Sequence, residues 1–224
     1  TVEDATPYVL GPQGMVGGSG SMFGNYLAPA GDINGDGLND LLTSATEFWS
    51  EGATIGALYV LYGPIEGGEL AAEDPYSNVS EILGQSDWHW GYSFAGAADI
   101  NGDGYDDVVS GAPGRALTGF GGGAGSAFVY LGPLSAALEA EEADLEFQPE
   151  SAGEFFGSGV AISTAPTMDT AEITDTESLL IAIASTSMQA GTGPGSTLTG
   201  GVSFYLDPAD SPDTSSGTLI GDDP

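Results

Sequence analysis

Two acidic, glycine-containing stretches decide the fold: residues 32–40 read DINGDGLND, and residues 99–107 read DINGDGYDD, 67 positions later. An aromatic–glycine pair repeats with nearly the same period, as Phe23-Gly24, Trp90-Gly91 and Phe156-Gly157. Self-similarity at a fixed period is typical of a chain built from copies of one structural unit. We therefore expect repeated units of about 67 residues.

Apolar segments recur in the same order within each unit. One type reads GALYVLYGP at residues 56–64, GSAFVYLGP at residues 125–133 and GGVSFYLDP at residues 200–208. Shorter apolar segments occupy residues 15–17, 82–84, 145–147 and 219–221. Each unit holds about four short runs rich in Val, Leu, Tyr and Phe, separated by Gly, Pro, Asp and Ser, and this pattern predicts four β-strands per unit. The one helix candidate, residues 134–143, is expected to decorate a loop.

The composition excludes several classes of function. The chain has 224 residues with 33 Asp or Glu, one His, no Cys and a single basic residue, Arg115, so its formal net charge is −32. Nucleic-acid binding through a basic patch and docking on an anionic membrane surface both need Lys and Arg. Disulfides and thiolate metal sites need cysteine. The longest apolar runs, among them residues 179–184, are too short for membrane insertion. Apolar residues make up 41% of the chain, which is enough for a buried core.

The repeated units resemble the FG-GAP repeats of integrin α-subunit propellers. Both have an aromatic–glycine pair, an Asp-rich loop, a strand ending in Gly-Ala-Pro (here residues 111–113) and then a Tyr-Val-Tyr type of strand. The resemblance covers nearly the whole chain. It is weaker in the third unit, which lacks the acidic pattern, and residues 43–46 replace Gly-Ala-Pro in the first. The resemblance implies an all-β fold of about three FG-GAP-like β-propeller blades, each of four antiparallel strands, as an incomplete propeller or a segment of a larger one.

We expect one propeller region over residues 1–224. Its parts are the tail of a preceding blade (1–22), blade one (23–89), blade two (90–155) and blade three with a degenerate loop (156–224). Residues 8–12 resemble the end of a third strand, and the chain stops where another aromatic–glycine pair is due, so the array looks cut from a longer one at both ends. Missing blades or a partner chain should then cover the outer blade surfaces.

The two acidic stretches have the chemistry of calcium loops. Calcium takes six to eight oxygen ligands from flexible carboxylates, amides and carbonyls, and glycine at the sixth position allows the sharp turn. Side chains at positions one, three, five and nine would bind, together with the backbone carbonyl at position seven. In the first loop the predicted ligands are Asp32, Asn34, Asp36, the carbonyl of Leu38, and Asp40. In the second they are Asp99, Asn101, Asp103, the carbonyl of Tyr105, and Asp107.

Two alternatives to this calcium loop stay open. An EF-hand or dockerin loop needs an acid at position twelve and a following helix. Position twelve is Thr43 in one stretch and Ser110 in the other, and strand-like residues follow, which favours a propeller hairpin. The other alternative is an Asx-rich turn satisfied by its own backbone. Two copies with the same ligand positions favour two Ca²⁺ sites over that alternative.

Other conspicuous residues give weaker signals. The third loop, residues 164–178, is expected to be metal-free, with an irregular site at Asp169, Asp175 and Glu177 as the alternative. Residues 88–90, Trp-His-Trp, are expected to pack between blades rather than form a carbohydrate-stacking patch. His89 has no second His or Cys for a zinc site, and no catalytic motif accompanies it. Asn78-Val79-Ser80 is a glycosylation sequon.

Together these patterns predict a calcium-binding extracellular β-propeller module for adhesion or recognition, secreted or at the cell surface, and not an enzyme. Its ligand, a protein or a carbohydrate, is not named by the sequence. The alternative is a structural subunit of a self-assembling surface filament or sheath, with blades completed between chains by self-association. A weaker third possibility is a non-catalytic module attached to a secreted enzyme. No nucleic-acid partner is expected.

Overall fold

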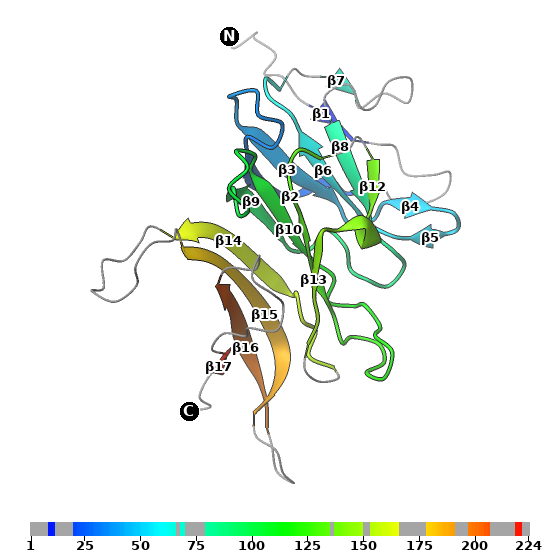
Figure 1. Ribbon diagram of the computed structural model, residues 1–224. Coiled ribbons are helices and arrows are strands. Elements are labelled where there is room, and N and C mark those ends of the chain that lie inside the picture. The colour runs from blue at the N-terminus through cyan, green and yellow to red at the C-terminus, as the bar shows by residue number, and fades with distance from the viewer. Residues whose placement is uncertain are drawn as a thin grey trace, which may run out of the picture.

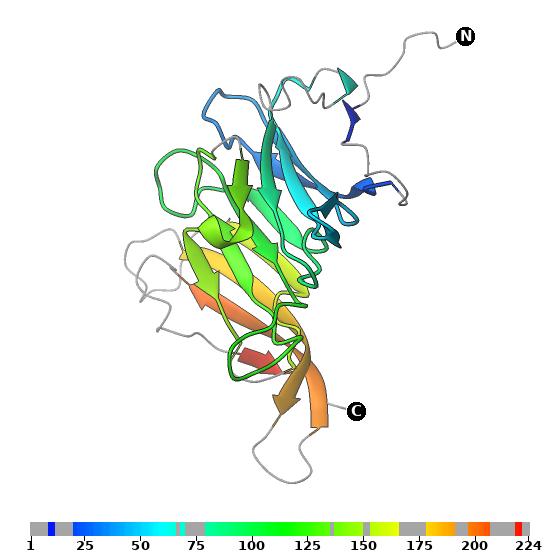
Figure 2. The same ribbon diagram turned by 90° about the vertical axis from the view of Figure 1, so that its right-hand side faces the viewer.

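The computed structural model describes residues 9–11, 20–65, 68–69, 79–134, 137–149, 153–165, 178–190, 197–206 and 218–220. Over these residues the fold is all-β, apart from one three-residue 3₁₀ turn, and three sheets of four or five strands lie side by side (Figures 1 and 2). The predicted fold class is therefore confirmed.

The first blade contains four antiparallel strands that follow one another along the chain. They are β2 (Phe23–Gly31), β3 (Asp40–Ala45), β6 (Ala57–Leu61) and β8 (Val79–Leu83). A two-stranded ribbon, β4 (Trp49–Ser50) and β5 (Ala53–Thr54), lies in the connection between β3 and β6. Outside the blade, β1 (Val9–Leu10) pairs with β7 (Gly68–Glu69).

Blades two and three repeat this arrangement. Blade two contains β9 (Phe94–Ala98), β10 (Asp107–Gly111), β11 (Ala127–Tyr130) and β13 (Leu145–Phe147). Blade three contains β14 (Gly159–Ala165), β15 (Ser178–Ala190), β16 (Thr197–Leu206) and β17 (Thr218–Ile220). The first strand of blade two, β9, contacts the first strands of both neighbours, β2 and β14. The residue limits proposed for each blade stay predictions.

The main cores lie between neighbouring blades. Strand β6 is buried along its whole length, because Leu58 and Val60 face blade two while Ala57, Tyr59 and Leu61 face the other way. A second cluster joins blade two to blade three through residues such as Val129 and Ile181. Strands covered on both faces carry near-continuous apolar runs, which explains why these segments lack polar alternation.

The backbone explains the repeated aromatic–glycine pair. The residue before each pair, Met22, His89 or Phe155, has a φ between 51° and 56°. The glycines of the three pairs also have positive φ, of 83°, 80° and 85°. Glycine adopts this region without the steric cost that a Cβ adds. The pair therefore marks a sharp turn that leads into the first strand of each blade.

The helix expected over residues 134–143 is wrong. Strand β12 (Ala137–Glu139) instead pairs in parallel with β8 of blade one, and a short 3₁₀ turn, Ala140–Glu142, follows it. The Tyr130 hydroxyl donates a hydrogen bond to the Ala140 carbonyl at 2.7 Å and anchors this turn. Pairing with the free edge of another blade thus overrides the helical propensity of Ala, Glu and Leu.

Candidate calcium loops

The two acidic stretches form equivalent loops in neighbouring blades. Loop one, residues 32–40, joins β2 to β3, and loop two, residues 99–107, joins β9 to β10. Both lie at the same end of the sheets (Figure 1). All ten predicted ligand residues are described, so the structure shows how each loop arranges its oxygens.

In loop one the side-chain oxygens turn inward onto the backbone. The Asp36 N–H donates to Asp32 Oδ1 and to Asn34 Oδ1, both at 3.0 Å. These two oxygens therefore converge on one point. Asp32 Oδ2 accepts from the Gly37 N–H at 2.9 Å, and Asp36 Oδ1 accepts from the Leu38 N–H at 2.8 Å. The first, third and fifth positions thus gather around one turn.

Loop two repeats these bonds one for one. The Asp103 N–H donates to Asp99 Oδ1 at 3.2 Å and to Asn101 Oδ1 at 3.1 Å. Asp99 Oδ2 accepts from the Gly104 N–H at 2.8 Å, and Asp103 Oδ1 accepts from the Tyr105 N–H at 2.9 Å. The sequence repeat therefore corresponds to a repeated conformation of the oxygen donors.

The ninth position of each loop is buried. Asp40, 4% exposed, accepts hydrogen bonds at 2.9 Å from the N–H groups of Ile33 and Gly63. Asp107, fully buried, accepts from Ile100 at 2.7 Å and from Gly132 at 2.8 Å. Each carboxylate thereby ties its loop to the glycine just beyond the third strand of its blade.

Burial opposes the charge on these two carboxylates. Burial, together with a smaller repulsion from the nearby Asp103 and Asp99, raises the pKa of Asp107 to about 6 and outweighs the two backbone hydrogen bonds, which lower it. Burial also raises the pKa of Asp40. A bound cation would stabilise both ionised carboxylates.

The donor set fits calcium in its chemistry. Each loop offers carboxylates, one amide oxygen and a backbone carbonyl, which are the hard oxygen ligands that calcium prefers. Across the described ranges, however, no three acidic or histidine side chains stand close enough together to form a preassembled metal cluster. The hydrogen bonds to backbone N–H groups are those of the Asx-turn alternative. The structure thus brings the side chains of the first, third and fifth positions into one turn without coordination geometry, and the calcium assignment stays a prediction.

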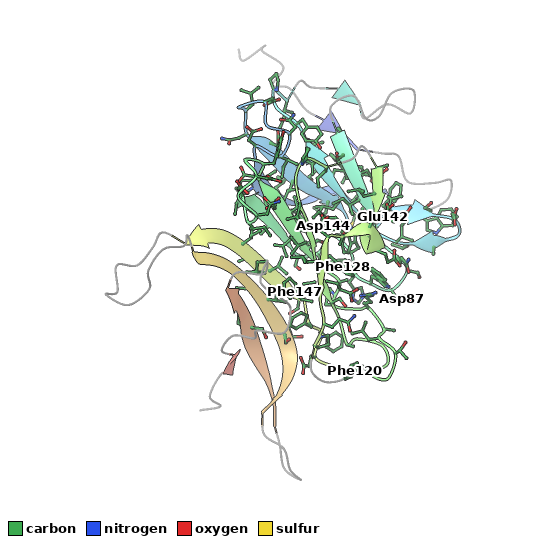
Figure 3. The ribbon with its side chains drawn as sticks, in the orientation of Figure 1. Asp87, Phe120, Phe128, Glu142, Asp144 and Phe147 are labelled. Carbon is green, nitrogen blue, oxygen red and sulfur yellow. The ribbon has the colours of Figure 1, made fainter. Side chains whose placement is uncertain are left out.

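The tryptophans of residues 88–90 pack between blades, as expected from the sequence. Trp88 is 8% exposed and Trp90 is 1% exposed. The Trp88 ring stacks on the buried ring of Phe128, which is labelled in Figure 3, with centroids 5.6 Å apart. Trp90 Nε1 donates to the Ile82 carbonyl at 3.1 Å.

Sequence reasoning missed the role of the single arginine. The Arg115 guanidinium lies 4.6 Å from the Trp88 ring centroid and 5.0 Å from that of Phe128. It donates to Ser126 Oγ at 3.0 Å and pairs with Glu146. A lone Arg in an acidic chain was a signal, but its partners are set by tertiary contacts that no spacing in the sequence encodes.

Sequence reasoning also missed a small cavity of about 130 Å³ at the end of blade one opposite the loops. It lies between the β3–β6 connection and the turn that leads into β9. Its wall includes carboxylates, an amide, an imidazole and an aromatic ring, from Glu47, Gln85, Asp87, His89 and Tyr92.

Four predicted positions lie outside the described residues. Three are the acids of the third loop, and the fourth is the sequon asparagine: Asp169, Asp175, Glu177 and Asn78. The structure describes no helix long and apolar enough to cross a membrane.

Comparison with known proteins finds one family match and several similar proteins. Residues 90–130 match the family model described as FG-GAP repeat, and this range includes loop two. Integrin alpha-E from Mus musculus is 32% identical over 147 residues, which are 63% of this chain and 12% of that protein. Integrin alpha pat-2 from Caenorhabditis briggsae is 34% identical over 110 residues (47% and 9%), and integrin alpha-7 from Homo sapiens is 35% identical over 126 residues (55% and 10%). The chain thus spans about a tenth of the length of these relatives. These matches confirm the resemblance to FG-GAP repeats, which the family model shows directly for residues 90–130.

Proposed function

We propose that this chain is a calcium-binding, extracellular β-propeller module for adhesion or recognition, and that it is not an enzyme. One observation carries the proposal: two loops 67 residues apart hold their carboxylate and amide oxygens with four equivalent hydrogen bonds each. The similarity to integrin α subunits supports the adhesive role and the extracellular location.

Each loop would hold one Ca²⁺ through its five predicted ligands. In loop one these are the side chains of Asp32, Asn34, Asp36 and Asp40 and the carbonyl of Leu38. In loop two they are the side chains of Asp99, Asn101, Asp103 and Asp107 and the carbonyl of Tyr105. A bound calcium ion would supply positive charge and would hold these oxygens together as its ligands. Because Asp40 and Asp107 also bind the glycines beyond β6 and β11, occupancy would fasten the loop to three strands of its blade.

Calcium would stabilise the folded state because a ligand that binds only the native protein adds its binding free energy to folding. The two ions would also offset four negative charges of an acidic chain. We place the ligand-binding site at the opposite end of the blades. There the cavity beside Tyr92 offers polar groups and an aromatic ring to a protein or carbohydrate ligand.

Thermal unfolding in excess calcium and in excess chelator tests this function. We expect the wild-type Tm to fall by more than about 5 °C on chelation, since loss of even 1–2 kcal/mol shifts Tm by several degrees. The double variant Asp36→Ala/Asp103→Ala should unfold at the same temperature in both buffers. Asp87→Asn, which removes an exposed charge outside the loops, should keep the wild-type response. A wild-type Tm that ignores chelation would contradict the proposal.

Self-association is the second candidate function, and exposed apolar side chains on blade one and just before it favour it. Leu27 is 63% exposed, Met22 is 53% exposed, and Leu38 and Tyr26 are also exposed. Light scattering after size-exclusion chromatography tests this function. Assembly through Leu27 predicts oligomers of the wild type that Leu27→Asp dissociates, whereas a monomer at all concentrations would contradict it.

A further inference from the structure

Loop two holds the first ligand of loop one through a residue that neither loop uses as a ligand. Asp106 Oδ2 accepts a hydrogen bond from the Asp32 N–H at 2.7 Å. In return the Asp106 N–H donates to the Asp32 carbonyl at 3.1 Å. Asp106, 74 residues away in sequence and in the neighbouring blade, therefore binds both the N–H and the carbonyl of Asp32.

Glycines in and beside loop one make room for this contact. A Cβ on Gly31 would lie 2.0 Å from Asp106 Oδ2 and 2.9 Å from the Cα of Ala97. A Cβ on Gly35 would lie 2.6 Å from Cε1 of Tyr105. Both glycines also have positive φ, of 78° and 75°. Loop one is thus shaped to rest against the seventh and eighth residues of loop two.

The corresponding residues of loop one are placed differently. Its seventh and eighth residues, Leu38 and Asn39, are both exposed. Asn39 therefore has the same position in its loop as Asp106, but no other blade of the described residues covers it. Residues of loop two therefore hold loop one in place, and the matching residues of loop one do not do the same for loop two.

We propose that Asp106 is a positioning residue for calcium at loop one and that it couples the two calcium sites. The proposal rests on the proposed function. Asp106 stands between Tyr105 and Asp107, both predicted ligands of loop two, so an ion there would fix the backbone on both sides of Asp106. Fixing Asp106 orders Asp32, and loop one then binds its ion with less loss of conformational freedom. Because coupling is reciprocal, each ion raises the affinity for the other.

Calorimetric calcium titrations of the full chain separate the two sites through single-site variants. Asp103→Ala leaves loop one as the binding site, and Asp36→Ala leaves loop two. We expect Asp103→Ala to lower the calcium affinity of loop one on the order of tenfold relative to the wild type, within the usual range of coupling between sites. Asp106→Ala in an otherwise wild-type chain should cause a similar loss at loop one. In the Asp36→Ala background, it should leave loop two within about twofold.

Two further variants control for folding and charge. Asp106→Asn keeps an oxygen acceptor for the Asp32 N–H and should recover most of the affinity. Asn39→Ala changes the matching exposed position and should leave both sites as in the wild type. Hydrogen exchange in chelator reports on the contact without metal: the Asp32 amide should exchange slowly in the wild type and fast in Asp106→Ala.

The outcomes distinguish this inference from the proposed function. If two ions bind and Asp106→Ala leaves the affinity of loop one unchanged, the coupling is wrong while the calcium function stands. Negative cooperativity, with repulsion between the ions outweighing the shared ordering, would also overturn it. If the wild type binds no calcium, the proposed function itself fails.

Discussion

The buried aspartates at the ninth position show that an ionised carboxylate is unfavourable in these loops without a cation. Asp107 is fully buried and accepts two backbone hydrogen bonds, yet burial still raises its pKa to about 6 from an ordinary 3.8. Without a cation, the ionised form of this residue therefore destabilises the fold relative to the unfolded chain. Asp40 has the same surroundings, and its pKa is also raised.

This residue predicts the pH dependence of stability in chelator. A carboxyl whose folded pKa exceeds its unfolded pKa holds its proton more tightly in the native state. The stabilisation that the protonated Asp107 carboxyl gives the folded state is therefore fully present below about pH 3.8 and is lost as pH rises through about 6. We expect the free energy of unfolding, measured by urea titration, to fall between pH 4 and pH 6, and excess calcium to reduce this fall.

Asp107→Asn supplies the comparison, because it removes the titrating group. The variant should show a shallower fall between pH 4 and pH 6 than the wild type, whereas the exposed-site control Asp87→Asn should follow the wild type. Equal slopes for wild type and Asp107→Asn would show that general repulsion among the acids, rather than this carboxyl, sets the dependence.

Strands and turns show how far the sequence could be read. The four runs per repeat and the loops between first and second strands were predictable, because period, turn residues and β-branched or aromatic runs all agree locally. Strand β12 was not, since its partner β8 lies in another blade and only the fold brings them together. The Arg115–Glu146 pair, the cavity and the Asp106 contact likewise depend on which segments meet across blades.

The burial of Trp90 at the turn into β9 predicts how much the aromatic residue of the aromatic–glycine pair adds to the free energy of unfolding. Trp90 is buried between blades one and two, and its ring centroid lies 5.7 Å from that of Phe128 and 6.4 Å from that of Tyr130. Trp90→Ala should lower the free energy of unfolding by about 3–5 kcal/mol, through lost burial and the cavity that remains. Trp49→Ala, on the exposed ribbon strand β4, should cost about 1 kcal/mol or less by urea titration. Equal losses would contradict the packing role.

At the scale of the whole molecule, blade packing and charge act against each other. Neighbouring blades bury apolar side chains on shared faces, which stabilises the fold. The chain also has 33 acidic residues and only one arginine, so like charges repel one another. That arginine is enclosed by Trp88 and Phe128 and pairs with Glu146, so it offsets little of the charge elsewhere. Cations at loops one and two would add positive charge at one end of two adjacent blades, and would leave the opposite end to recognise a ligand.

Isothermal titration of the calcium-free wild-type chain with CaCl₂ tests the central claim most directly. The account predicts two ions per chain, one ion for Asp36→Ala and one for Asp103→Ala, and no specific binding by the double variant. Absence of binding by the wild type, or two sites that persist in the double variant, would contradict the assignment of calcium to loops one and two.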